Sequence, residues 1–296
     1  MADDTGPMPT EPTSITVDGV TAPLHMPFYY ASLSNLWVFF PVSPKALAPY
    51  FAQSPYLKGF APYLFGGKAL MNVNFQNYTG HGGMMLETVN EVELNILSYP
   101  TARVLDVPMG MKLEDYLRGE DQTKTIGNLR LHVPADNSFA VAAGIALFGE
   151  PKFLASFDYE QPAPNNPGQK TWAVTCFDCN PAPDPTDKKA CRAHTVFTLL
   201  VDTCNLDGYL SNGSPQVEYG VLDGRPIGSN WSMNGPFTSW CPLPSKRAKL
   251  SMGGSAHPMC TDMKKLLGRA PKAVAAQLFT SPPVAAEPRA YYVDIV

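Results

Sequence analysis

Short apolar runs separated by turns of Pro, Gly and Asn recur along this 296-residue chain. Apolar runs bounded by such turns are typical of β-strands. Strands are predicted at residues 34–42, 69–76, 84–97 and 129–133, with more strands and turns after residue 152 and a last strand at 290–296. The pattern predicts a β-rich α+β fold in which a curled antiparallel sheet surrounds an internal pocket.

Short helices are predicted between the strands. Ser43 and Pro44 have the chemistry of a helix N-cap and first turn. A second helix is expected at residues 111–118, where Gly119 provides a stop signal, and two more at 262–267 and 271–279. The small, apolar segment before the Gly149-Glu150-Pro151 turn is instead predicted to be a strand.

Composition limits the functions that are open to the chain. Its net charge is −4, and its 22 Lys and Arg residues form no basic stripe, which argues against nucleic acid as a partner. Residues 1–22 mix Asp, Thr, Pro and Gly without periodicity, so a mobile leader is expected before a single domain at 23–296. No signal-peptide pattern and no membrane-spanning run is visible, and a cytoplasmic protein with reduced cysteines is expected.

Lys152 is the first candidate for chemistry. It follows the turn at Gly149 and stands among the apolar residues Phe148, Phe153 and Leu154. A free lysine has a pKa near 10.4, so about one molecule in 2,500 carries the nucleophilic amine at pH 7. Apolar surroundings that lower this pKa by about three units make half the molecules reactive, at a cost of about 4 kcal/mol. On the residues alone, however, a surface lysine in a turn is the commoner case.

The spacing Gly144-x-x-Leu147-x-x-x-Pro151-Lys152 resembles the active-site segment of the acetoacetate decarboxylase superfamily, in which the lysine forms an imine. Two other segments share the resemblance, Gly83-Met84-Met85-Leu86-Glu87-Thr88 and Pro288-Arg289-Ala290. The resemblance implies a divergent member of that superfamily, with stretches near residues 100–127 and 162–239 that fit it less well. It also implies a homo-oligomer.

The resemblance assigns roles to individual residues. It implies that Lys152 is the Schiff-base nucleophile and that Glu87 is the active-site glutamate, which would stabilise the cationic imine and move protons. Chemistry alone leaves Glu87 open as a solvent-facing residue, because Glu91 and Glu93 follow it at even spacing. Glu150, Phe148, Phe153 and His81 are the candidates for binding substrate.

Three positions depart from the family pattern. Phe153 follows Lys152, where the family has a second lysine. The family's arginine near the first strand has no counterpart at residues 32–34, and a family carboxylate fifteen residues before Glu87 falls on Asn72. These departures predict a carbonyl substrate different from acetoacetate.

Three functions therefore stay open. The first is a cofactor-independent Schiff-base lyase that acts on a small keto acid or ketone. The second is an aldolase or dehydratase of the same superfamily, which works through an enamine. The third is a catalytically silent ligand-binding module.

The cysteines suggest a separate metal site. Cys176, Cys179, Cys191 and His194 have the number and spacing of ligands in a tetrahedral Cys₃His zinc site. The alternative is that these cysteines simply flank strands, since apolar runs lie on both sides. A structural zinc is the only bound group expected, because a covalent imine on lysine needs no cofactor.

Overall fold

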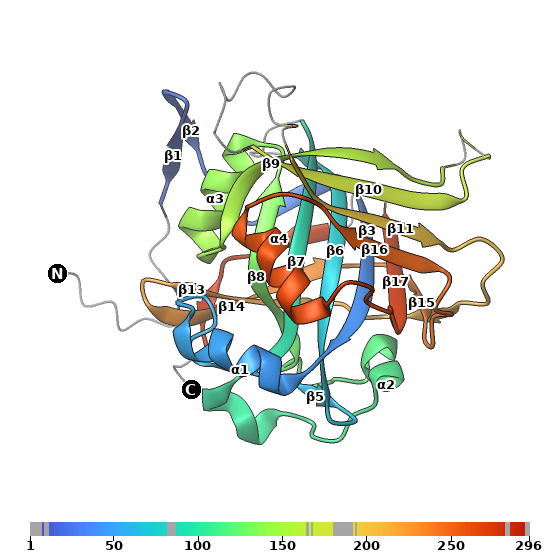
Figure 1. Cartoon of the computed structure of the whole chain (residues 1–296). Helices are drawn as coiled ribbons and strands as arrows, with labels where there is room; N and C mark the ends of the chain where they lie inside the picture. The colour runs from blue at the N-terminus through green and yellow to red at the C-terminus, as the bar shows by residue number, and fades with distance from the viewer. Residues whose placement is uncertain are drawn as a thin grey trace.

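The computed structural model describes residues 8, 12–81, 87–163, 166, 168–179, 192, 194–281 and 285–293. Strands predominate in this part of the chain, as the recurring apolar runs predict (Figure 1). The strands are β1 (Ser14–Val17), β2 (Val20–Pro23), β3 (Phe28–Val42), β4 (Phe60–Pro62), β5 (Leu64–Phe65), β6 (Lys68–His81), β7 (Thr88–Pro100), β8 (Gly127–Ala135), β9 (Lys152–Glu160), β10 (Thr171–Asp178), β11 (His194–Asp202), β12 (Tyr209–Ser211), β13 (Gln216–Leu222), β14 (Arg225–Met233), β15 (Phe237–Trp240), β16 (Ala248–Met252), β17 (Ala275–Ser281), β18 (Ala285–Glu287) and β19 (Tyr291–Tyr292). The helices are α1 (Pro44–Gln53), η1 (Thr101–Asp106), α2 (Leu113–Arg118), α3 (Ser138–Phe148) and α4 (Pro258–Leu267).

The long strands β3, β6, β7 and β8 pair antiparallel in that order. Strand β8 then pairs in parallel with both β9 and β13, and β9 continues antiparallel into β10, β11 and β16. Beyond β13 lies β14, and short pairings through β18 connect β14 back to β3. The predicted curled sheet is thus confirmed, although it is mixed rather than purely antiparallel.

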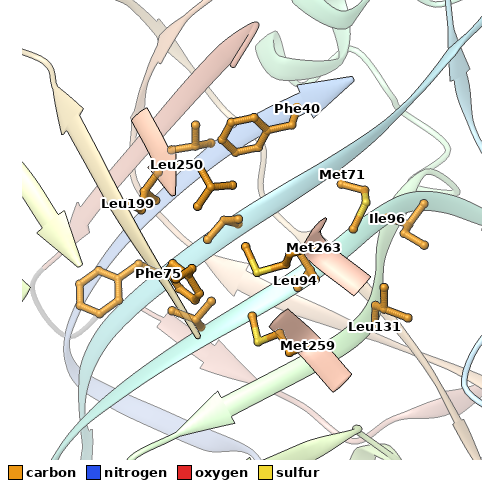
Figure 2. Close-up of a cluster of buried hydrophobic side chains, with 14 of the residues drawn as sticks. Phe40, Met71, Phe75, Leu94, Ile96, Leu131, Leu199, Leu250, Met259 and Met263 are labelled. Atoms are coloured by element: carbon orange, nitrogen blue, oxygen red, sulfur yellow. The ribbon is translucent and has the colours of Figure 1, made fainter. Parts of the chain in front are cut away.

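One face of β6 and β7 packs into the main apolar core. Side chains such as Phe75 and Leu94 meet Met259 and Met263 of α4 there, and Leu199 and Leu250 come from β11 and β16 (Figure 2). Burial of each such side chain contributes about 1.5–3 kcal/mol to stability. This core fixes β6, β7 and β8 as a rigid support for the opposite face.

The opposite face of β6 and β7 is polar and buried as well. Gln76 lies opposite Glu91 and Asn74 opposite Glu93, and all four side chains are almost fully buried. Alternating strands usually expose their polar face to water. Here the curled sheet encloses it, and this enclosed polar face holds the candidate site.

Residues 138–148 form helix α3, so the prediction of a strand before Lys152 is wrong. The side chain of Asn137 caps the helix by accepting a hydrogen bond from the Ala140 amide at 3.0 Å, and Gly149 ends it with a left-handed φ of 56°. The helix is apolar on all sides, which left no 3.6-residue pattern to indicate it.

The prediction of a helix at 271–279 is also wrong, because residues from Ala275 onward form β17. This strand pairs with β3, where Ala276 lies opposite Val38. The small, apolar residues fit a strand that is buried against the sheet. The preceding helix, α4, was predicted correctly but starts earlier, at Pro258.

The expected mobile leader contains a β-hairpin, so that prediction fails for residues 14–22. Strands β1 and β2 pair through a turn at Asp18 and Gly19, where both residues have positive φ angles (51° and 78°). Asp-Gly is a favoured pair for such turns. Ile15 of the hairpin packs with Phe139 of α3, so the hairpin covers one side of that helix (Figure 1). The predicted last strand is described only as β19, because residues 294–296 lie outside the described residues.

Candidate functional site

Helix α3, the turn after it and strand β9 deliver Lys152 to the enclosed polar face. The Glu150 amide donates a hydrogen bond to the carbonyl of Gly144 at 3.2 Å, which turns the chain back along the helix. Lys152 then opens β9 and lies opposite Val133 of β8. Its side chain is 8% exposed, so the amine lies inside the protein.

Two carboxylates hold the Lys152 amine. The Nζ atom lies 3.0 Å from Oε2 of Glu91 on β7 and 2.9 Å from Oε2 of Glu150. The Tyr78 hydroxyl donates a hydrogen bond to the same Glu91 oxygen at 3.0 Å. The sequence interpretation expected apolar neighbours around Lys152, but the structure gives it two ion-pair partners.

Arg130 of β8 anchors the acidic side of the site. Its guanidinium contacts Glu150 Oε1 at 3.2 Å, Glu93 Oε1 at 3.3 Å and the carboxylate of Glu218. Glu93 also accepts hydrogen bonds from the amides of Asn74 and Asn95 at 3.1 and 2.9 Å. Each polar group is therefore held by others that are also buried, which fixes Glu150 beside Lys152.

The charges shift one another's pKa values. Burial alone lowers the pKa of Lys152, but Glu150 and Glu91 outweigh burial and raise it above the usual range. Burial raises the pKa of Glu91 to about 7, and Lys152 limits the rise. Burial also acts to raise the pKa of Glu150, but Arg130 and Lys152 together lower it. The resting site therefore holds an ammonium, an ionised Glu150 and a Glu91 that titrates near neutrality.

Gly144 of α3 makes room for this arrangement. A Cβ atom at this position would overlap the Glu150 carboxylate and would lie 2.5 Å from Cδ and 2.9 Å from Nζ of Lys152. The glycine in the Gly-x-x-Leu-x-x-x-Pro-Lys spacing therefore has a physical role, because only a glycine lets the lysine lie against the helix.

A small cavity of about 40 Å³ lies beside Lys152. A volume of this size holds a few water molecules or a small organic group. One wall is polar and the other apolar. The polar wall comprises Gln76, Tyr78, Glu91, Glu93, Arg130, Asn137, Glu150, Lys152 and Glu218, and the apolar wall includes Phe28, Tyr30, Val89, Phe139, Ala143, Phe148 and Trp231.

Glu87, the predicted active-site glutamate, does not lie beside Lys152. It is exposed, it precedes β7, and it accepts a hydrogen bond from Asn137 at 3.1 Å beside a separate cavity under the β1–β2 hairpin. Glu91, four residues further along the chain, occupies the position beside Lys152 that was predicted for Glu87. Asn74 and Gln76 of β6 lie opposite Glu93 and Glu91 of β7, so polar residues alternate in step on the two strands. This shared polar pattern was the signal that could have directed the assignment to Glu91.

The assignment of Glu91 in place of Glu87 also changes which residue stands fifteen positions earlier, where counting from Glu87 gave Asn72. Fifteen residues before Glu91 stands Gln76, which pairs with Glu91 across β6 and β7 and lines the cavity. Asn72 lies deeper in the same polar face and donates a hydrogen bond to Asn128. Both Gln76 and Asn72 are thus uncharged amides on this polar face.

The predicted substrate-binding residues divide into two groups. Phe148 and Glu150 line the cavity, as expected from their neighbourhood to Lys152. Phe153 points to the other face of β9 and stacks on the His257 ring with a centroid separation of 3.9 Å. His81 is exposed at the end of β6 and is not among the lining residues described. Phe153 and His81 are therefore misassigned, because alternation along a strand sends neighbours to opposite faces.

Sequence reasoning missed Arg130, Glu93 and Glu218. These residues come from three different strands, β8, β7 and β13, and no local motif connects them. Arg130 gave one weak signal, since it is a charged residue within an apolar run that was predicted to be a buried strand.

The structure does not assemble the predicted zinc ligands. Cys176 is a free, fully buried thiol in the main core, whereas Cys179 is disulfide-bonded and has no thiolate for a metal. His194 is exposed, and Cys191 lies outside the described residues. The disulfide also differs from the expectation that the cysteines are reduced, although Cys204, Cys241 and Cys260 are free. Among the described residues, no group of three or more His, Cys, Asp and Glu side chains is arranged to hold a metal ion.

No protein-family model and no curated protein sequence matches this chain. Solved structures do match over almost its whole length. An acetoacetate decarboxylase from Legionella pneumophila matches 98% of this chain and 92% of its own, with a TM-score of 0.54 and 10% identity. An acetoacetate decarboxylase-like enzyme from Sphingomonas wittichii RW1 matches 94% and 97%, with a TM-score of 0.53 and 14% identity.

A third match is the enduracididine biosynthesis enzyme MppR, whose structure contains the condensation product of pyruvate and imidazole 4-carboxaldehyde. It covers 92% of this chain and 88% of its own, with a TM-score of 0.52 and 12% identity. The predicted resemblance is thus confirmed at the level of the fold. Separately, none of the helices in the described ranges has the length and apolar character needed to cross a bilayer.

Proposed function

We propose that this chain is a cofactor-independent Schiff-base enzyme in which Lys152 forms an imine with a small oxo acid or ketone. The observation that carries the proposal is the buried Lys152 amine, held at 3.0 and 2.9 Å between Glu91 and Glu150 beside a cavity. The fold is that of acetoacetate decarboxylases, and the fold relative MppR is complexed with a condensation product of pyruvate, which supports carbonyl chemistry on this fold.

The first step is loss of a proton from the Lys152 ammonium. Glu91 is the acceptor, because its pKa of about 7 leaves much of it as carboxylate near neutral pH. The amine lone pair then attacks the carbonyl carbon, and the oxygen takes one proton from the attacking nitrogen and one from Glu91. The carbon–oxygen bond breaks, the oxygen leaves as water, and Glu91 is a carboxylate again. The product is a cationic iminium on Lys152.

The two carboxylates suit this iminium. Glu150 stays ionised beside Arg130 and offers a negative charge next to the new cation. The iminium then draws electrons from the neighbouring bond, so that the substrate loses either a carboxyl group or a proton. Loss of carbon dioxide makes the protein a lyase of the decarboxylase type, whereas loss of a proton gives an enamine for aldolase or dehydratase chemistry.

Trapping with borohydride tests the proposal. Incubation with a panel of small ketones, 2-oxo acids and 3-oxo acids plus borohydride should add a reduced adduct to the Lys152 peptide, detectable by mass spectrometry. Lys152→Arg should remove the adduct, because a guanidinium stays protonated. Lys68→Arg, at an exposed position on β6, serves as the matched control. If no compound in the panel gives an adduct, the chain is a ligand-binding module instead.

A further inference from the structure

The charge around the cavity determines which carbonyl compounds fit it. Four carboxylates and two cations line the space beside Lys152: Glu91, Glu93, Glu150 and Glu218 against Arg130 and Lys152. With Glu91 protonated, three carboxylates still oppose two cations. The site is therefore negative in either state of Glu91, before any ligand binds.

Neither cation is available for a substrate carboxylate. Arg130 contacts Glu93, Glu150 and Glu218 and is almost fully buried. Lys152 becomes the imine nitrogen, so its single charge stays between Glu91 and Glu150. The remaining polar groups on the described part of the lining are uncharged, such as the amides of Gln76 and Asn137.

The other side of the cavity is apolar. Phe28 and Tyr30 of β3, Phe139 and Phe148 of α3, and Trp231 of β14 form this wall. A carboxylate placed here would lose its water without gaining a cationic partner, which is strongly unfavourable. An uncharged carbonyl compound meets amide donors on one side and apolar contacts on the other.

We propose that this imine-forming site accepts small uncharged ketones or aldehydes and discriminates against carbonyl compounds that bear a free carboxylate. The inference rests on the proposed imine at Lys152 and specifies its substrate class. An uncharged substrate has no carboxyl group to lose, so the iminium gives up an α-proton. The C–H bond breaks, its electron pair forms the C=C bond of an enamine, the C=N π pair returns to nitrogen, and Glu91 takes the proton.

Two isosteric pairs of compounds test the charge preference. Pyruvamide and pyruvate differ in little but one negative charge, as do acetoacetamide and acetoacetate. The rate of borohydride-trapped adduct formation on Lys152 is measured for each compound and divided by its rate with a simple alkylamine in solution, which removes intrinsic reactivity. The amides are expected to react at least 100-fold faster than the acids. Deuterium from D₂O should also enter the methyl group of pyruvamide in the presence of the protein.

A variant of Glu218 tests whether the carboxylates that occupy Arg130 cause the preference for uncharged compounds. Glu218→Gln removes one carboxylate from Arg130, and the preference for the amide should fall about tenfold or more. Glu87→Gln, at an exposed carboxylate outside the cavity, should leave the preference unchanged. If Glu218→Gln does not fold, the comparison of amide and acid on the unmodified protein still decides the matter.

The outcomes separate this inference from the proposed function. Equal or faster adduct formation with pyruvate or acetoacetate, or efficient release of acetone from acetoacetate, overturns the charge preference but leaves the imine chemistry intact. An unchanged preference in Glu218→Gln also contradicts the charge argument. Absence of an adduct with every amide, ketone and acid overturns the proposed function itself.

Discussion

At the scale of single residues, the site depends on which glutamate faces the lysine. Glu87 and Glu91 lie four residues apart near the start of β7, and the spacing alone allows either to reach the same face. The structure places only Glu91 against Lys152 and leaves Glu87 exposed beside another cavity. A substitution at Glu87 therefore serves as the matched control for the same substitution at Glu91.

Glu91→Gln should slow imine formation at Lys152 by about 100-fold or more, because the variant lacks the carboxylate that accepts the amine proton. Glu87→Gln should change the rate by less than about twofold. The measurement is the rate of borohydride-trapped adduct on the Lys152 peptide. The opposite ranking of the two variants would return the catalytic role to Glu87.

Gly144→Ala should remove the adduct and destabilise the fold by about 1–3 kcal/mol, because the new Cβ overlaps Glu150 and crowds Lys152. A helix interior otherwise gains about 0.5–1 kcal/mol from this replacement. Gly254→Ala, at an exposed position where a Cβ meets nothing within 4 Å, is the control. Urea denaturation measures the stabilities, and a Gly144→Ala protein as stable as the parent with full adduct formation would contradict the packing argument.

At the scale of secondary-structure elements, α3 sets the position of the two candidate-site residues that follow it, Glu150 and Lys152. The helix begins at the Asn137 cap and ends at Gly149, after which Glu150 and Lys152 point back toward Gly144. Contacts with β1 of the hairpin and with β9 hold the helix in this position.

Asn137→Ala should lower the free energy of unfolding by about 1 kcal/mol, since the Ala140 amide loses its cap. Asn137→Asp keeps an acceptor oxygen and should restore most of that stability. Denaturant unfolding of both variants provides the check. Equal losses in the two variants would show that the cap is not the source of the effect.

At the scale of the whole molecule, the buried charges connect stability to pH. The pKa of Glu91 is raised from 4.5 to about 7 by burial, so the folded protein binds this proton more tightly than the unfolded chain does. Its contribution to stability is therefore complete below about pH 4.5 and is lost as the pH rises through about 7.

The unfolding free energy of the parent protein should thus fall relative to that of Glu91→Gln between pH 5 and 8, by at most about 3 kcal/mol. Glutamine stands in for the protonated acid and does not titrate, so the difference between the two proteins isolates this group. Urea unfolding at each pH supplies the values. A difference that stays constant over the range would mean that Glu91 does not titrate there.

Much of this protein could be predicted from its sequence alone. The apolar runs bounded by turns predicted the long strands, the Gly-x-x-Leu-x-x-x-Pro-Lys spacing singled out Lys152, and Gly119 marked the end of α2. These are local signals, because strand alternation, turns and helix stops depend on neighbours in the chain. Helix α3 was not predicted because its side chains are apolar on all sides, which leaves no polar face to reveal a helical period.

Only the tertiary structure decided where the polar faces of β6 and β7 lie. The same alternation fits a face in water or a face enclosed by the curled sheet, and enclosure brings Arg130 of β8, Glu218 of β13 and Glu91 of β7 to one lysine. The charge state of Lys152 was decided in the same way, because a pKa depends on charges within a few ångströms in space and not on neighbours in sequence. Sequence therefore identified the lysine, and the three-dimensional arrangement of the strands set its partners.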